Sequence, residues 1–159
     1  MRSLLFVPGD SEKKLEKGFS SEADVVIVDL EDSVAPSNKE NARRIAAEFL
    51  ATRTKMQKPV YVRVNDLTTG LTDADLAALV PVRPAGIMLP KSTSGADVER
   101  LSVKLRVQEA EQDLPDGGIS VIAIATETAA SLFTGATYAG ASQRLAGLTW
   151  GAEDLSAAI

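Results

Sequence analysis

The sequence predicts an α/β fold built from about the first six strand–helix units of a (β/α)8 TIM barrel. Short β-branched runs alternate with charged or amphipathic segments, as in a parallel sheet covered by helices. An open doubly wound sheet usually carries a glycine-rich phosphate loop after its first strand, and the turn VPGDSEKK here has none. We therefore predict one partial barrel domain over residues 1–159, about two units short of the usual ~250 residues.

Strands are predicted wherever a β-rich apolar run stops at glycine, proline or a charged residue. The clearest run, DVVIVDL, is apolar at successive positions, which indicates burial on both faces of a parallel sheet. The first run is closed by Pro8-Gly9-Asp10, and later runs stop near Arg63, Lys91 and Glu127. The six predicted strands are residues 3–7, 24–30, 59–64, 85–89, 120–126 and 145–150.

Helices are predicted between the strands from capping residues and apolar spacing. Ser11 is placed to cap the first helix, because its hydroxyl can accept a hydrogen bond from a free backbone amide. Ser37 with Glu40, and Thr72 with Asp75, have the spacing of a capping box. The predicted helices are residues 12–19, 37–50, 72–80, 96–112 and 128–133, and a further helix begins after residue 150.

The composition excludes several classes of site. The chain has no Cys and no His, which removes disulfides, Cys/His zinc sites, cysteine nucleophiles and Ser-His-Asp triads. Any metal must be bound by oxygen ligands, which favours Mg²⁺, Mn²⁺ or Ca²⁺. The net charge of −5 does not indicate nucleic-acid binding, and no apolar run approaches a membrane span. The N-terminus lacks a signal-peptide pattern, so we expect a cytoplasmic protein.

Polar or ionisable residues follow all six predicted strands. The carboxyl ends of parallel strands meet at one edge, where barrel enzymes carry their active sites. Glu127 and Asp154 follow successive strands, and two carboxylates plus waters suit Mg²⁺, so we predict that they bind one ion. Alternatively, Asp154 and Glu153 are early helix residues stabilised by the helix dipole. The strand-end set is Pro8-Gly9-Asp10, Glu31-Asp32, Arg63 with Asn65, Pro90-Lys91, Glu127 and Glu153-Asp154.

The cations at this edge each admit two interpretations. Arg63 lies on an otherwise apolar strand, and its planar fork suits a bidentate grip on a substrate carboxylate. The alternative is an ion pair with Glu31 or Asp32. Lys91 either neutralises the acidic residues or contacts substrate directly.

The chain contains several of these segments in the order of a known family. They are RSLLFVPGD, VDLEDSVAP with Lys39 and Arg43 following, VRVN, MLPK, TETA and GAEDL. In order and rough spacing, the chain resembles the citrate lyase beta subunit and malyl-CoA lyase group of the HpcH/HpaI aldolase superfamily. The resemblance covers essentially the whole chain, and DLEDSVAP and GAEDL in this order are specific together. It implies a Mg²⁺-dependent TIM barrel.

The resemblance also implies roles for individual positions. Glu127 and Asp154 match the two metal-binding carboxylates, and Arg63 matches the arginine that holds the oxo-acid carboxylate. Glu31 and Asp32 match an acidic cluster behind the metal. The positions that match CoA-ester contacts are Phe6, Lys13 and Lys17. From the residues alone, the lysines could equally belong to a solvated helix face.

The activity implied is a carbon–carbon lyase that splits a 3-hydroxyacyl-CoA, such as citryl-, citramalyl- or malyl-CoA, into an acyl-CoA and a 2-oxo acid. Mg²⁺ is the implied cofactor, with Mn²⁺ as an alternative. Thr126 departs from the aliphatic residue usual in the family. Family members continue through two more strands and a segment that supplies a catalytic aspartate to a neighbouring subunit, which implies a homo-oligomer.

Other functions stay open at this point. A metal-dependent aldolase acting on pyruvate-like oxo acids without CoA would use the same carboxylates. A non-catalytic binding or assembly subunit could keep an incomplete barrel with a metal pocket. The resemblance also allows association with other citrate lyase subunits.

Overall fold

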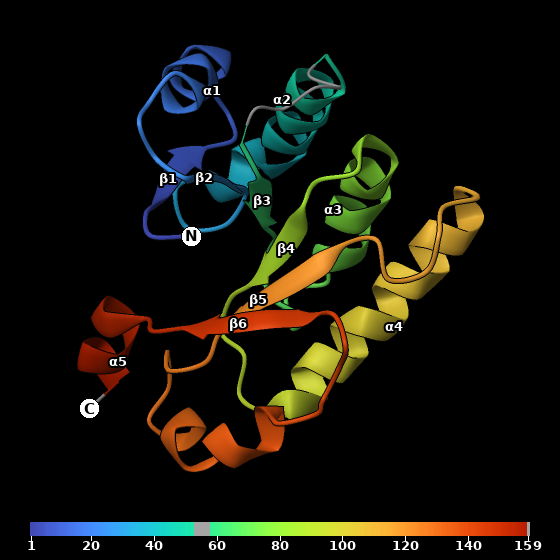
Figure 1. The fold of residues 1–159 in the computed structure, drawn as a ribbon. Coiled ribbons are helices and arrows are strands. Elements are labelled where there is room, and N and C mark those ends of the chain that lie inside the picture. Colours follow the sequence, from blue (N-terminus) through green and yellow to red (C-terminus); the bar gives the residue numbers. More distant parts are fainter. Residues whose placement is uncertain (53–57, 159) are drawn as a thin grey trace.

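The computed structural model describes residues 1–52 and 58–158, which form one parallel sheet with helices packed along its outer face (Figure 1). The strands run in the order β1-β2-β3-β4-β5-β6, and every neighbouring pair is parallel. This confirms the predicted strands and their sequential barrel order. Their bounds are Leu4–Pro8, Val25–Asp29, Val60–Arg63, Gly86–Leu89, Ser120–Ile124 and Leu145–Thr149.

The first four α-helices lie between successive strands and the fifth follows the last strand, as predicted. Ser11 caps α1, because its hydroxyl oxygen accepts a hydrogen bond from the backbone amide of Lys14 at 3.4 Å. The segment predicted as a helix at residues 128–133 instead contains a 3-10 turn, η3 (Ala130–Phe133). The α-helices are α1 (Glu12–Phe19), α2 (Lys39–Ala51), α3 (Thr72–Leu79), α4 (Gly95–Glu111) and α5 (Ala152–Ala158).

The two predicted capping boxes are wrong. Ser37 lies within a 3-10 turn, η1 (Pro36–Asn38), which proline begins, and the first residue of α2 comes later. Thr72 is itself the first residue of α3, and its hydroxyl donates to the carbonyls of Asn65 and Asp66.

The core has two layers because side chains alternate between the faces of each strand. The larger layer lies between the sheet and the helices, where Val98, Leu101 and Leu105 of α4 are fully buried. A smaller apolar cluster covers the other face of the sheet. Its members are Val25, Ile27, Tyr61, Met88, Ile122 and Ile124. Every residue of β2 is buried, which confirms the two-sided burial predicted for it.

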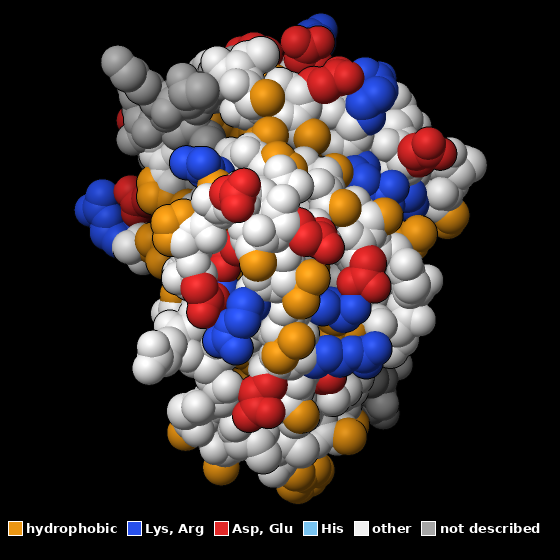
Figure 2. Space-filling view, turned by 90° about the vertical axis from the view of Figure 1, so that its right-hand side faces the viewer, with side chains coloured by type: hydrophobic (Ala, Val, Ile, Leu, Met, Phe, Trp, Pro, Cys, Tyr) orange, Lys and Arg blue, Asp and Glu red, His pale blue; other side chains and the backbone are white. Residues whose placement is uncertain are grey.

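The two edge strands, β1 and β6, do not pair with each other, as predicted for a barrel of six units. Apolar side chains on both strands are consequently open to solvent: Phe6 of β1 is 45% exposed and Leu148 of β6 is 49% exposed. The side of the molecule that carries α4 differs, because acidic and basic side chains alternate there with small apolar areas (Figure 2). Among the described helices, none is long and apolar enough to cross a membrane.

Candidate active site

Charged side chains gather at the carboxyl ends of β2 to β5 and at the start of α5. Asp29 and Arg63 end neighbouring strands and are direct partners in the parallel register, so the sheet itself places them side by side. The loops that follow β2, β4 and β5 add further charges at the same edge. We call the following seven residues the site cluster: Asp29, Glu31, Asp32, Arg63, Lys91, Glu127 and Asp154.

Arg63 is held mainly by a residue that the sequence did not indicate. Its Nε and Nη2 donate to the two carboxylate oxygens of Asp29 at 2.8 and 2.7 Å, in a bidentate pair. Its Nη1 lies 3.1 Å from Glu31 Oε2 and 3.2 Å from Asp32 Oδ2. The guanidinium carbon also lies 4.9 Å from the centre of the Phe6 ring, a cation–π contact. The ion-pair interpretation is thus observed, and a hold on substrate stays a prediction.

Asp29 anchors both Arg63 and the loop after β2. Its carboxylate accepts hydrogen bonds from the backbone amides of Glu31 at 2.9 Å and Ser33 at 3.1 Å. Burial acts to raise the pKa of Asp29, but the hydrogen bonds from Arg63 and Ser33 outweigh it and hold the pKa below its usual value. Asp29 was not among the predicted site residues, because it belongs to an otherwise apolar strand. A carboxylate as the last residue of a buried strand was the signal that could have indicated it.

Glu31 is buried with only part of its carboxylate satisfied. Oε1 accepts a hydrogen bond from Lys91 Nζ at 2.8 Å. Oε2 is inaccessible to solvent and accepts no hydrogen bond within the described part of the chain, although Arg63 is close. Burial raises the pKa of Glu31 despite the neighbouring cations Lys91 and Arg63. The ammonium of Lys39 donates to the carbonyls of Leu30 and Glu31, which fixes this loop.

Glu127 is 5% exposed, and its pKa is the most strongly shifted among the acids of the site cluster. Burial raises the pKa of Glu127 to about 7, and the nearby charges of Asp154 and Glu31 add to the effect. The backbone amide of Lys91 donates to its Oε2. A Cβ at Gly151 would lie 2.4 Å from Glu127 Cγ, so the glycine of GAEDL leaves the room that this side chain needs. Thr126, the departure from the family pattern, accepts a hydrogen bond from the Gly151 amide at 3.1 Å.

The two acids of GAEDL lie in different surroundings. Asp154 is half-buried and close enough to Glu127 to raise its pKa, whereas Glu153 is exposed. The structure therefore brings Asp154 to Glu127 and leaves Glu153 outside.

The donors of the site cluster fit a hard divalent cation. Residues 1–52 and 58–158 contain no group of three or more acids placed to surround a metal. Two carboxylates with waters are sufficient for Mg²⁺, and Glu127 with Asp154 provides that pair. A cation would satisfy the buried oxygen of Glu31 that accepts no hydrogen bond in the described part of the chain, and it would lower the raised pKa of Glu127. The assignment of the two metal ligands stays a prediction.

Some residues at the predicted edge are not part of this cluster. Lys13 and Lys17 are exposed on α1 and, within the described chain, form no ion pair with the site cluster. Asn65 is buried and donates through both its backbone and side-chain nitrogens to Asp75. Asn65 is thus a structural residue, and the proposed CoA contacts of the lysines stay untested.

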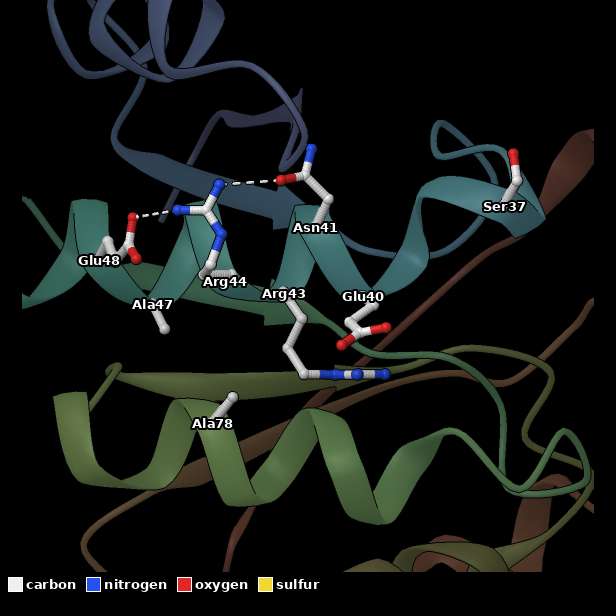
Figure 3. Close-up of a pocket in the computed structure, with 8 residues that line it drawn as sticks. All are labelled: Ser37, Glu40, Asn41, Arg43, Arg44, Ala47, Glu48 and Ala78. Carbon is white, nitrogen blue, oxygen red and sulfur yellow. Dashed lines mark hydrogen bonds and ion pairs between the residues drawn. The ribbon is translucent and has the colours of Figure 1, made fainter.

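A groove of about 720 Å³ lies between α2 and α3, on the outer side of the sheet (Figure 3). Two partners hold Arg44 on α2: it contacts Glu48 at 2.6 Å and Asn41 at 2.9 Å. Arg43 crosses from α2 toward α3, and its Nε donates to the buried Asp75 at 2.9 Å. This arginine therefore ties two helices together and has no contact with the site cluster.

Residues 2–159 match the HpcH/HpaI aldolase/citrate lyase family. The chain belongs to this family. This confirms the predicted resemblance, and a solved structure of the family shows the same fold.

Three relatives illustrate the match. A (3S)-malyl-CoA thioesterase from Cereibacter sphaeroides is 35% identical over 98% of this chain and 50% of its own length. The citrate lyase subunit beta of Escherichia coli is 35% identical over 96% of this chain and 50% of its own length. The crystal structure of the protein CitE from Mycobacterium tuberculosis, in complex with magnesium, acetoacetate and coenzyme A, superimposes with a TM-score of 0.76 at 34% identity, covering 98% of this chain and 50% of that one. The chain spans about half the length of the curated relatives it matches.

Proposed function

We propose that this chain carries the metal-binding and oxo-acid-binding half of a Mg²⁺-dependent CoA-ester lyase. The substrate class is a 3-hydroxyacyl-CoA, and the products are an acyl-CoA and a 2-oxo acid. The observation that carries the proposal is that Glu127, whose pKa is raised to about 7, lies beside Asp154 and near Glu31, whose buried Oε2 accepts no hydrogen bond in the described part of the chain. The citrate lyase subunit and the magnesium- and CoA-bound relative support the choice of reaction and ligands.

Each residue has a separate role in this proposal. Glu127 and Asp154 would hold Mg²⁺, which supplies Lewis-acid stabilisation of negative charge on a substrate oxygen. Arg63 Nη1 is the guanidinium nitrogen that Asp29 does not hold, and it would take one oxygen of the oxo-acid carboxylate. Asp29 keeps the guanidinium oriented, so that the carboxylate is fixed relative to the bond that breaks.

The test is an assay of the full chain against malyl-, citramalyl- and citryl-CoA, with Mg²⁺ or with EDTA. Chromatography measures the acyl-CoA, and phenylhydrazone formation measures the 2-oxo acid. We expect equal amounts of both products with Mg²⁺, none with EDTA, and loss of both in Asp154→Asn but not in Glu153→Gln. Metal-independent turnover, or turnover retained by Asp154→Asn, would contradict the assignment.

A second candidate is CoA-ester hydrolysis, which the name of the malyl-CoA thioesterase relative favours. Hydrolysis releases a free thiol and a hydroxy acid, without a 2-oxo acid. A thiol reagent added to the same assay therefore separates the two reactions. Thiol release without oxo acid would replace the lyase by the thioesterase.

We also propose that the chain works as an oligomer, since the exposed apolar side chains of β1 and β6 need cover. Light scattering coupled to size-exclusion chromatography should give a mass above that of one chain. A monomer at micromolar concentration would contradict this.

A further inference from the structure

We propose that the ammonium of Lys91 is an intramolecular counter-ion of the site cluster, and that it competes electrostatically with the divalent cation. Lys91 then stabilises the metal-free protein and weakens metal binding. The inference rests on the proposed metal site at Glu127 and Asp154, and it adds a residue that sets the affinity of that site.

Lys91 reaches the site cluster through two separate groups. Its backbone amide donates to Glu127, and its Nζ lies 2.8 Å from Glu31 Oε1 and 3.7 Å from Asp32 Oδ1. Its φ is +52°, in the left-handed region that is costly for any residue except glycine. The strained residue therefore joins the loop after β4 to the acids that follow β2 and β5.

The charges of the cluster leave Lys91 as its second cation. Arg63 neutralises Asp29 through the bidentate pair. The remaining acids are Glu31, Asp32, Glu127 and Asp154, and Lys91 is the one other described cation with an ion pair to any of them. Lys39 is close, but its ammonium is bound to backbone carbonyls. Removal of the Lys91 charge would leave the cluster more negative, and this would favour the metal-bound protein over the metal-free protein.

A purely structural lysine leads to the opposite expectation. If Lys91 only positions Glu31 and Glu127, its replacement loosens both acids and weakens metal binding. A counter-ion predicts tighter metal binding in the less stable protein. The direction of the change in affinity therefore separates the two roles.

The experiment is calorimetric titration of MgCl₂ into the parent chain and into Lys91→Met, Lys91→Arg and Lys104→Met. Lys104 is a matched control, because it pairs with the exposed Asp73 on α3 and takes no part in the site cluster. We expect Lys91→Met to bind Mg²⁺ about tenfold more tightly than the parent. This is the effect on affinity expected from removing one positive charge several ångström away in protein and water. Lys91→Arg keeps the charge and should stay close to the parent, as should Lys104→Met. In EDTA, Lys91→Met should melt at a lower temperature than the parent and gain more from added Mg²⁺.

Unchanged or weaker Mg²⁺ binding by Lys91→Met overturns the inference and leaves the proposed function standing. If the parent itself binds no Mg²⁺, both the inference and the metal site are wrong. Should Lys91→Met fail to fold without metal, Lys91→Gly provides the same test. Glycine keeps the backbone amide on Glu127, adopts the left-handed conformation without strain and removes the charge.

Discussion

Two buried arginine–carboxylate groups lie at opposite ends of the sheet and differ in how completely they are satisfied. At the amino end, Arg144 donates to both oxygens of Glu109, at 2.9 and 2.5 Å. Glu109 also accepts from the backbone amides of Gly117 and Ile119, so each of its oxygens has two donors. Burial opposes ionisation, but Arg144 and these amides hold the pKa of Glu109 below its usual value.

At the carboxyl end, the same residue types form a group with acids in excess. Arg63 satisfies Asp29, while Glu31 keeps a buried oxygen that accepts no hydrogen bond in the described part of the chain, and the pKa of Glu127 is raised to about 7. We infer that this contrast distinguishes charges buried for stability from charges buried for binding. A closed network stabilises the fold, whereas an open one retains binding capacity for a cation or an anionic substrate.

The largest expected effect is at the closed network. Arg144→Met should lower the free energy of unfolding by about 3–5 kcal/mol, because it leaves Glu109 charged, buried and without its partner. Urea unfolding followed by circular dichroism measures this, and Mg²⁺ affinity of the folded protein should not change. The double variant Arg144→Met/Glu109→Leu should recover much of the loss. A loss below about 1 kcal/mol for Arg144→Met would mean that the network contributes little.

The next effect is on metal binding at the open network. Asp154→Asn should weaken Mg²⁺ binding about a hundredfold, since it removes one of two charged ligands, with little loss of stability. Glu153→Gln is the control, because Glu153 is exposed and one residue away. Calorimetric titration measures both. If Glu153→Gln loses the metal and Asp154→Asn keeps it, the two acids of GAEDL have exchanged roles.

The same contrast explains how much the sequence could predict. The strands, their parallel order and the cluster around Glu127 follow from local patterns, because each strand end is marked by its own residues. The capping boxes failed because Ser37 lies inside a 3-10 turn that begins at Pro36, and because the Thr72 hydroxyl donates to the carbonyls of Asn65 and Asp66. The Asp29–Arg63 pair depends on the register of β2 against β3, which no single segment contains.

The closed network was not predicted for a related reason. Arg144 and Glu109 are 35 residues apart, and neither belongs to a recognisable motif. Their pairing requires α4 to pack against β5 and the loop before β6, which only the assembled fold provides. The members of the site cluster could be predicted to lie close together because most of them follow successive strands, whereas the Arg144–Glu109 ion pair leaves no such pattern in the sequence.

Arg63→Lys tests whether the bidentate pair at the open end works like the one at Arg144. Lysine keeps the charge but loses the planar fork, so we expect a loss of about 1–3 kcal/mol in unfolding free energy and in substrate binding. Urea unfolding and the Michaelis constant for the CoA ester measure the two parts. If stability falls while turnover and substrate affinity stay at the parent values, Arg63 is a structural partner of Asp29 only.

The smallest effect concerns pH, to which the two networks should respond in opposite directions. In the folded protein without metal, Glu127 keeps its proton up to about pH 7, whereas the unfolded chain releases it near pH 4.5. Its contribution to stability is therefore fully present below pH 4.5 and is lost as the pH rises through 7. Between pH 6 and pH 8 the free energy of unfolding should fall by about 1 kcal/mol. Glu109, with a lowered pKa, contributes stability at neutral pH that is lost on acidification.

Urea unfolding in EDTA at pH 6 and pH 8, for the parent, Glu127→Gln and Glu109→Gln, measures this difference. Glu127→Gln cannot titrate, so its free energy of unfolding should not fall between pH 6 and pH 8. Glu109→Gln should be less stable than the parent at both pH values and should still show this fall. Since metal must displace the proton on Glu127, Mg²⁺ affinity should rise as the pH approaches 7 and level off above it. A parent protein whose stability rises between pH 6 and pH 8, or whose Mg²⁺ affinity is flat there, would show that Glu127 is already ionised and that the two networks are alike.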